Sequence, residues 1–211
     1  MTTNSFDKFI QFFTKIDRER LDGLDASYFN GMDENEKQKA YVYLKNALEN
    51  GSAEAVAGLK ALCGKECAPL FEQRIKHLRN SPSLSEQRLS LALYLWEFTK
   101  DIQYQKDMIQ FLKSEKDLLK QTAIIFLSYT PTTEELIKNL EFVIAEDNDD
   151  TVLHVAAKQL LDRYGINAEN KKTKNLYKNN IIKFISGDNS IRQAALKWLR
   201  EYGENQGVQL Y

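Results

Sequence analysis

The chain has 211 residues, 43% of them hydrophobic and 28% charged, which is enough for one globular domain or one array of repeats. Its 29 Lys and Arg residues are balanced by 30 Asp and Glu residues, and the net charge of -1 argues against a protein that binds nucleic acid non-specifically. Because the chain has only 9 Gly and 3 Pro residues, we expect it to be mostly helical.

The first residues carry no sign of an export signal. The stretch MTTNSFDKFIQFF places Asp7 and Lys8 inside its apolar run, and no small-residue cleavage site follows it. No apolar run approaches the roughly 20 residues that span a bilayer, and Cys63 and Cys67 are expected to be free thiols in a reducing compartment. We therefore expect a cytoplasmic protein with no membrane partner.

Apolar residues three and four positions apart predict a succession of amphipathic helices. The first covers residues 5–21, and a broken stretch follows up to residue 32. In the next, Asp33 can cap the helix, Glu36 completes a capping box, and Gly51 ends it. Further helices are predicted over residues 52–64, 67–78, 83–100, 103–114, 116–129, 132–146, 150–165, 174–186 and 190–203. No segment alternates with period two, so we predict no strands.

Five of these helices carry a small residue that is followed by apolar residues three and four positions on. The small residues are Gly58, Ala92, Ala123, Ala157 and Ala195, with spacings of 34, 31, 34 and 38 residues. This period is typical of a solenoid of helical hairpins, in which the small residue lets two helices approach closely. The sequence therefore predicts an all-α superhelix of about five antiparallel helix pairs. Residues 1–32 would form an N-terminal cap, and residues 33–211 one continuous domain of repeats.

The repeat unit resembles the HEAT repeat. The stretch DNSIRQAALKWL is the closest copy, and DDTVLHVAAKQLL and EKDLLKQTAIIFL are looser ones. In each, a basic residue stands three positions before the small residue: Arg192, His154 and Lys120. The resemblance implies a HEAT-like architecture, and it gives His154 a structural position beside the seam between repeats instead of a catalytic role.

Residues that could support chemistry lack the spacing that the chemistry needs. Cys63, Cys67 and His77 fall short of the four ligands of a structural zinc site. The stretch GLKALCGK has five residues between its glycines, where a phosphate-binding loop has four. The acidic turn EDNDDT lacks the glycine and the glutamate of a calcium-binding loop. We expect no catalytic residue, no metal and no cofactor.

The partner-binding surface of such a solenoid is expected where the helices of the small residues turn away from the core. Positions two and five after each small residue point outward, because a helix turns about 100° per residue. These positions and their neighbours mix charges with aromatic rings, as protein interfaces do. The candidate partner-binding residues are Tyr94, Glu97, Ser128, Tyr129, Gln159, Asp162, Arg163, Lys197, Arg200 and Glu201. Tyr94 is expected to be the main anchor, since binding energy concentrates in aromatic and Arg residues.

The stretch LDASYFNGMDENEKQKAYVYLKNALENGSAEAVAGLKAL is similar to the N-terminal unit of bacterial HEAT-like immunity proteins. This resemblance implies a non-enzymatic protein that binds a cognate toxin and neutralises it. A HEAT-like alkylpurine DNA glycosylase is the alternative from another class, and it would place Tyr94, Trp96, Trp198 and Asp162 in a cationic cleft. The balanced charge disfavours this enzyme, and both tryptophans are predicted to lie in the core. A HEAT-repeat adaptor or chaperone is a third alternative.

The charge balance gives a first testable prediction. We expect duplex DNA to bind no more tightly than a dissociation constant of about 10⁻⁶ M near physiological salt, and the binding to weaken further as salt rises. Fluorescence anisotropy with labelled duplexes, with and without an alkylated base, measures this. Nanomolar binding to the alkylated duplex, or release of the damaged base, would establish the glycosylase instead.

Overall fold

The computed structural model describes residues 5–14, 24–81 and 85–207, and every regular element among them is a helix. The prediction of an all-helical protein without strands is therefore confirmed for the described part of the chain. Contacts divide the chain into two compact units, residues 1–104 and 105–211. The expected division into a cap of residues 1–32 and repeats from residue 33 onward stays a prediction.

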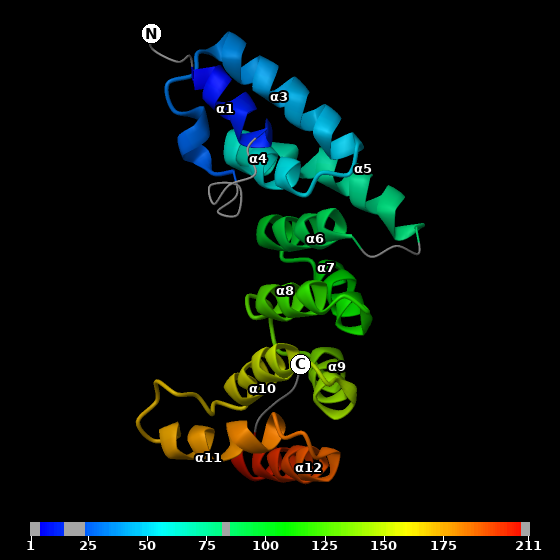
Figure 1. Ribbon diagram of the computed structural model, residues 1–211, viewed down its shortest axis with the longest axis vertical. Coiled ribbons are helices and arrows are strands. Elements are labelled where there is room, and N and C mark those ends of the chain that lie inside the picture. Colours follow the sequence, from blue (N-terminus) through cyan, green and yellow to red (C-terminus); the bar gives the residue numbers. More distant parts are fainter. Residues whose placement is uncertain (1–4, 15–23, 82–84, 208–211) are drawn as a thin grey trace. The chain divides into compact units, whose positions relative to one another are not determined.

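The first unit gathers its helices around an apolar core (Figure 1). Its elements are α1 (Ser5–Thr14), the 3-10 turn η1 (Ala26–Phe29), α3 (Glu34–Glu49), α4 (Glu54–Cys63), the 3-10 turn η2 (Gly64–Cys67), α5 (Ala68–Arg79) and α6 (Glu86–Thr99). Helix α3 packs on α1 and α4, while α6 packs on α4 and α5. The predicted extension of the first helix to residue 21 lies outside the described residues.

Local sequence signals place the ends of α3 as predicted. The Asp33 carboxylate accepts the Glu36 N–H at 2.8 Å, and the Glu36 carboxylate accepts the Asp33 N–H at 3.0 Å, which completes the capping box. Gly51 follows the helix with a φ of 95°, a conformation that suits glycine. On α4, a Cβ atom at Gly58 would lie 2.7 Å from Leu44 Cδ2, so a larger residue there would force the buried Leu44 side chain to shift.

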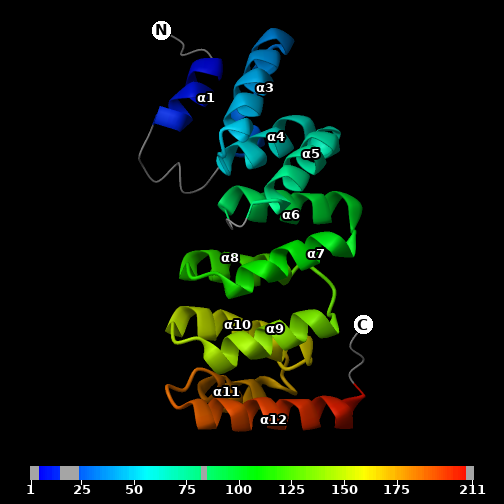
Figure 2. The ribbon, with the colours of Figure 1, turned by 90° about the vertical axis from the view of Figure 1, so that its right-hand side faces the viewer.

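The second unit consists of two rows of helices (Figures 1 and 2). Helix α7 (Ile102–Ile109) crosses the boundary between the units and is followed by η3 (Gln110–Lys113), α8 (Asp117–Leu127), α9 (Glu134–Glu146), α10 (Asp150–Arg163), α11 (Lys174–Phe184) and α12 (Asn189–Gln206). In one row α8 and α11 both pack on α10, and in the other η3 and α12 both pack on α9. The rows meet where α9 packs on α10 and α11 packs on α12.

All five small residues of the repeat pattern are buried, as predicted, but the last one lies in an unexpected row. Helices α8 and α10, which carry Ala123 and Ala157, pack side by side. Helix α12, which carries Ala195, packs on α9 instead, and Figure 2 shows it running below α9. Residues 164–173 join α10 to α11, whereas residues 147–149 suffice between α9 and α10. The longer connection lets α11 take the place beside α10 that a regular repeat gives to α12.

Two basic side chains stabilise the C-terminal end of α9. Lys120 of α8 forms an ion pair with Asp147, the residue that caps α9. Arg192 of α12 is 4% exposed and donates to the Ala145 carbonyl at 3.3 Å. Positive charge is favourable where the last carbonyls of a helix are left without intrahelical partners. The two basic positions of the repeat pattern that these residues occupy are therefore structural, as the resemblance implied.

The burial of Ala157 gives a prediction about stability. Ala157→Leu should overpack the contacts of α10 with its neighbours and lower the free energy of unfolding by about 1–3 kcal/mol. Ala194→Leu is the matched control, because Ala194 is exposed on α12. Denaturant unfolding of both variants measures the difference. An Ala157→Leu protein as stable as the control would mean that α10 is not packed as described.

Candidate functional site

A groove of about 450 Å³ lies between α8 and α10 in the second unit. Its lining comes from the C-terminal half of α8 and the outer side of α10: Ile124, Ile125, Ser128, Val155, Lys158, Gln159, Asp162 and Arg163. The groove therefore combines an apolar floor with polar side chains on its α10 side. It brings together four of the predicted partner-binding residues, namely Ser128, Gln159, Asp162 and Arg163.

The Gln159 side chain is buried between α8 and α10 and contributes to their packing. The side chain is 6% exposed, although its position two residues after Ala157 was expected to point outward. With its amide oriented to satisfy both groups, its nitrogen donates to the Ile124 carbonyl at 2.7 Å and its oxygen accepts the Ser128 N–H at 3.1 Å. The outward expectation is wrong here because α8 packs against this side of α10.

Arg163 closes the end of α8. Its guanidinium donates to the carbonyls of Leu127 and Thr130, each at 2.6 Å, and to the Thr132 hydroxyl at 3.2 Å. Leu127 is the last residue of α8 and its carbonyl also accepts from Thr130, whereas Thr130 lies beyond the helix. The hydrogen bonds of the Arg163 side chain thus stabilise the fold by holding α10 against the end of α8.

Asp162 is the acidic group of the groove. Partial burial raises the pKa of its carboxyl, although the nearby charges of Lys158 and Arg163 act in the opposite direction. Among the described residues its carboxylate accepts no hydrogen bond and forms no ion pair, in contrast to the fully committed Arg163. The charge of Asp162 is therefore available to a partner.

An apolar stripe runs along the exposed face of α8 beside this groove. It consists of Leu118, Ile125 and Tyr129, whose side chains are 67%, 49% and 68% exposed. An interval of seven residues places Leu118 and Ile125 on one face of α8, and Tyr129 follows just beyond the end of the helix. Tyr129 was among the predicted site residues, whereas Leu118 was missed because it precedes the small residue from which positions were counted. Its interval of seven from Ile125 was the signal in the sequence.

A shallow hollow of about 530 Å³ adjoins the groove where α10 faces α11. It is lined by His154, Lys158, Asp162, Asn167, Ala168, Glu169 and Tyr177. His154 is exposed in this hollow, beside the contact between α10 and α11. Its structural role stays a prediction.

The remaining predicted residues that belong to helices do not line the groove. In the first unit, the Lys60 ammonium lies 4.2 Å from the centre of the Tyr94 ring and forms an ion pair with Glu97. Burial, and then the charge of Glu97, raise the pKa of Tyr94. Tyr94 is therefore a half-buried residue with partners inside its own unit. Its role as the main anchor stays a prediction.

The three predicted residues of α12 belong to the other row of the second unit. Arg200 forms a bidentate ion pair with Glu141 of α9, with distances of 2.9 and 2.8 Å. The exposed Lys197 lies 4.0 Å from Glu201 on the same helix. The structure therefore does not group these residues with the groove, and any partner contact that they make would belong to another surface.

Comparisons of the chain with models of protein families, with curated proteins and with solved structures find no match. None of the helices in the described part of the chain is long and apolar enough to cross a bilayer. Within the same residues, no three His, Cys, Asp or Glu side chains are grouped so that they could hold a metal ion. The functional assignment therefore depends on the geometry of the groove and the stripe.

The hydrogen bonds of Arg163 give a second stability prediction. Arg163→Ala should leave the Thr130 carbonyl without its donor and the Leu127 carbonyl with only the donors of Thr130, and it should lower the free energy of unfolding by about 1–3 kcal/mol. Asp162→Asn is the neighbouring control. Its melting temperature should stay the same or rise at neutral pH, because the raised pKa of Asp162 means that folding disfavours its charged form. Thermal melts that show equal losses for both variants would contradict this division of roles.

Proposed function

We propose that the protein is a non-enzymatic protein-binding module whose principal contact surface is the α8 stripe and the adjoining α8–α10 groove. The observation that carries this proposal is the exposure of three large side chains in one segment: Leu118 and Ile125 on one face of α8, and Tyr129 just beyond its C-terminal end. Contiguous exposed apolar surface next to a groove is typical of protein interaction sites. The occupant is a segment of another protein that presents apolar side chains to this face.

The rigidity of the groove supports the proposal. Gln159 and Arg163 join α10 to the backbone of the last turn of α8 before any partner arrives. A surface that is already ordered loses little conformational entropy on binding, which favours affinity. Lys158 and Asp162 border the apolar floor with opposite charges, and an apolar centre with a polar rim is the usual anatomy of an interface.

The proposal extends to the architecture and the biological role. The stacking of α8 on α10, and of η3 on α9, supports a HEAT-like solenoid for this part of the chain, with a departure at α11 and α12. The similarity of residues 24–62 to bacterial HEAT-like immunity proteins supports neutralisation of a cognate toxin in the cytoplasm. An adaptor or chaperone would use the same kind of surface, and the identity of the partner distinguishes it from an immunity protein.

The positions of the tryptophans do not favour the glycosylase alternative. Trp96 is 6% exposed, as the core prediction required. Trp198 is half-buried against Tyr202, so its assignment to the core is wrong. Trp198 lies on α12, which packs on α9, whereas Asp162 lies on α10. Trp198 and Asp162, which the enzyme would require in one cleft, therefore lie in different rows of the second unit.

The proposal predicts that one charge on the stripe removes binding. Ile125→Glu should abolish capture of the partner from an extract of the source organism, because it would bury a carboxylate without a counter-charge. Ile182→Glu is the matched control, since Ile182 is an equally large, 63% exposed residue on α11. Mass spectrometry of proteins captured by the two variants and the wild type identifies the specific partner, and calorimetry then measures its affinity.

Two outcomes of this experiment decide the matter. Loss of one defined partner with Ile125→Glu, together with its retention by Ile182→Glu, supports the α8 surface. Retention of the partner by Ile125→Glu, with loss on Lys197→Glu of α12 or on Tyr94→Ala of α6, would place the interface elsewhere. Thermal melts of all four variants separate lost binding from lost folding.

A further inference from the structure

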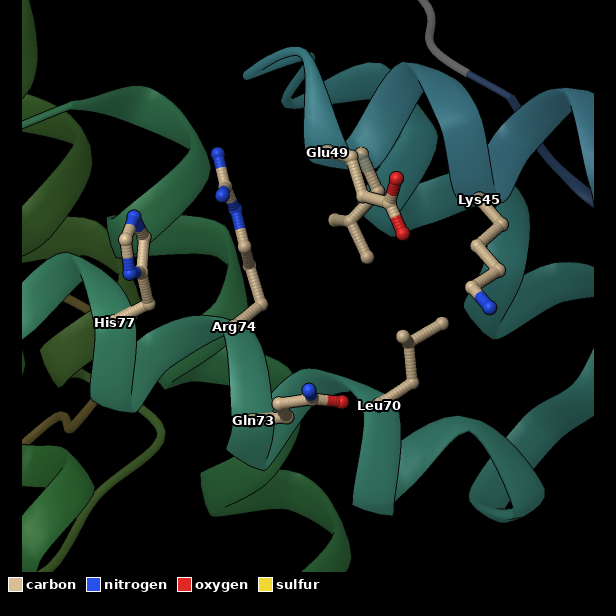
Figure 3. A pocket seen from close by; sticks show the side chains of 7 residues that line it. Lys45, Glu49, Leu70, Gln73, Arg74 and His77 are labelled. Atoms are coloured by element: carbon tan, nitrogen blue, oxygen red, sulfur yellow. The ribbon is translucent and has the colours of Figure 1, made fainter.

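A second hollow, of about 330 Å³, lies between α3 and α5 in the first unit. It is lined by Lys45, Leu48, Glu49, Leu70, Gln73, Arg74 and His77. Figure 3 shows Arg74 and His77 rising side by side from α5, with Lys45 and Glu49 on α3 across the opening. Cationic groups thus stand on both sides of a cavity whose inner wall includes two leucines.

Arg74 is oriented from behind by a buried amide. Its Nε donates to Gln87 Oε1 at 3.0 Å. Gln87 is 1% exposed, and its Nε2 donates to the carbonyls of Leu48 and Ser52 at 2.6 and 3.1 Å, at the end of α3. The packing of α3, α5 and α6 therefore fixes the position of the Arg74 guanidinium.

The two terminal nitrogens of this guanidinium remain available. Among the described residues these two nitrogens donate to no acceptor. The hydrogen bond that the Arg74 side chain does form there comes from its Nε and goes to Gln87. Glu49 lines the same hollow and yet forms no ion pair with Arg74 or Lys45 within that part of the chain. An oriented guanidinium with two free parallel donors matches the two oxygens of a carboxylate.

We propose that this hollow binds a carboxylate, which Arg74 holds in a bidentate pair. Lys45 adds positive potential from α3, and Leu70 contacts an aliphatic group next to the carboxylate. Glu49 disfavours a doubly charged phosphate by like-charge repulsion. The ligand is therefore a carboxylate with an apolar group beside it. Either the C-terminus of a peptide or an acidic side chain supplies this carboxylate. This site lies in the first unit and does not depend on the function proposed for α8 and α10.

Small probes test the proposal on the full chain. In nuclear magnetic resonance titrations near physiological salt, N-acetyl-leucine should shift the Arg74 Nε–H signal and the amides of residues 45–49 and 70–77, and the shifts should saturate. N-acetyl-leucinamide, which has the same shape without the charge, should leave these signals in place. N-acetylglutamate α-amide separates the two sources, because it carries only a side-chain carboxylate. Binding of either acid supports the proposal and names the source.

Two variants complete the test. Arg74→Lys keeps the charge but loses the planar fork, and it should weaken binding of N-acetyl-leucine by about tenfold or more. Lys76→Gln removes a charge from the exposed side of α5, outside the hollow, and should leave binding unchanged. Equal affinity of Arg74→Lys and wild type, equal shifts with acid and amide, or a preference for inorganic phosphate would each overturn the proposal. Thermal melts confirm that both variants fold.

Discussion

The structure of the second unit depends on the close packing of α10 with three other helices. Ala156 and Ala157 have no exposed surface, and their small side chains let α8, α9 and α11 all contact the same helix. Once α8 is held on one side of α10, Gln159 and Arg163 meet the backbone of its last turn. The exposed face of α8 carries Leu118 and Ile125, and Tyr129 follows just beyond the end of the helix. The proposed binding surface is thus a direct consequence of how α10 is packed.

Two arginines show how packing decides whether a side chain is available for binding. Arg163 uses its terminal nitrogens for the carbonyls at the end of α8, so it contributes rigidity to the groove. Arg74 uses only its Nε, for Gln87, and presents its remaining donors to a cavity. The sequence predicted Arg163 as a contact residue and did not single out Arg74. Hydrogen bonds to groups distant in the sequence make this difference, and a helical pattern does not reveal them.

Features that depend on neighbouring residues could be predicted from the sequence. The capping box of Asp33 and Glu36 is confirmed. The burial of Ala157 and its counterparts follows from the same local pattern of apolar residues. The row in which α12 lies could not be predicted, because it depends on the course of residues 164–173. The repeat pattern assumes that the connections between helices are equally long. It therefore places Lys197, Arg200 and Glu201 on the same surface as the residues of α10.

The central claim is that another protein covers the exposed face of α8. Hydroxyl-radical footprinting of the wild-type protein, alone and with its captured partner, measures the solvent exposure of each side chain directly. The account predicts that labelling of Leu118, Ile125 and Tyr129 falls strongly in the complex, while Phe142 on α9 and Ile182 on α11 keep the labelling expected from their exposure. Unchanged labelling along α8, with protection of Phe142 or Ile182 instead, would contradict the claim.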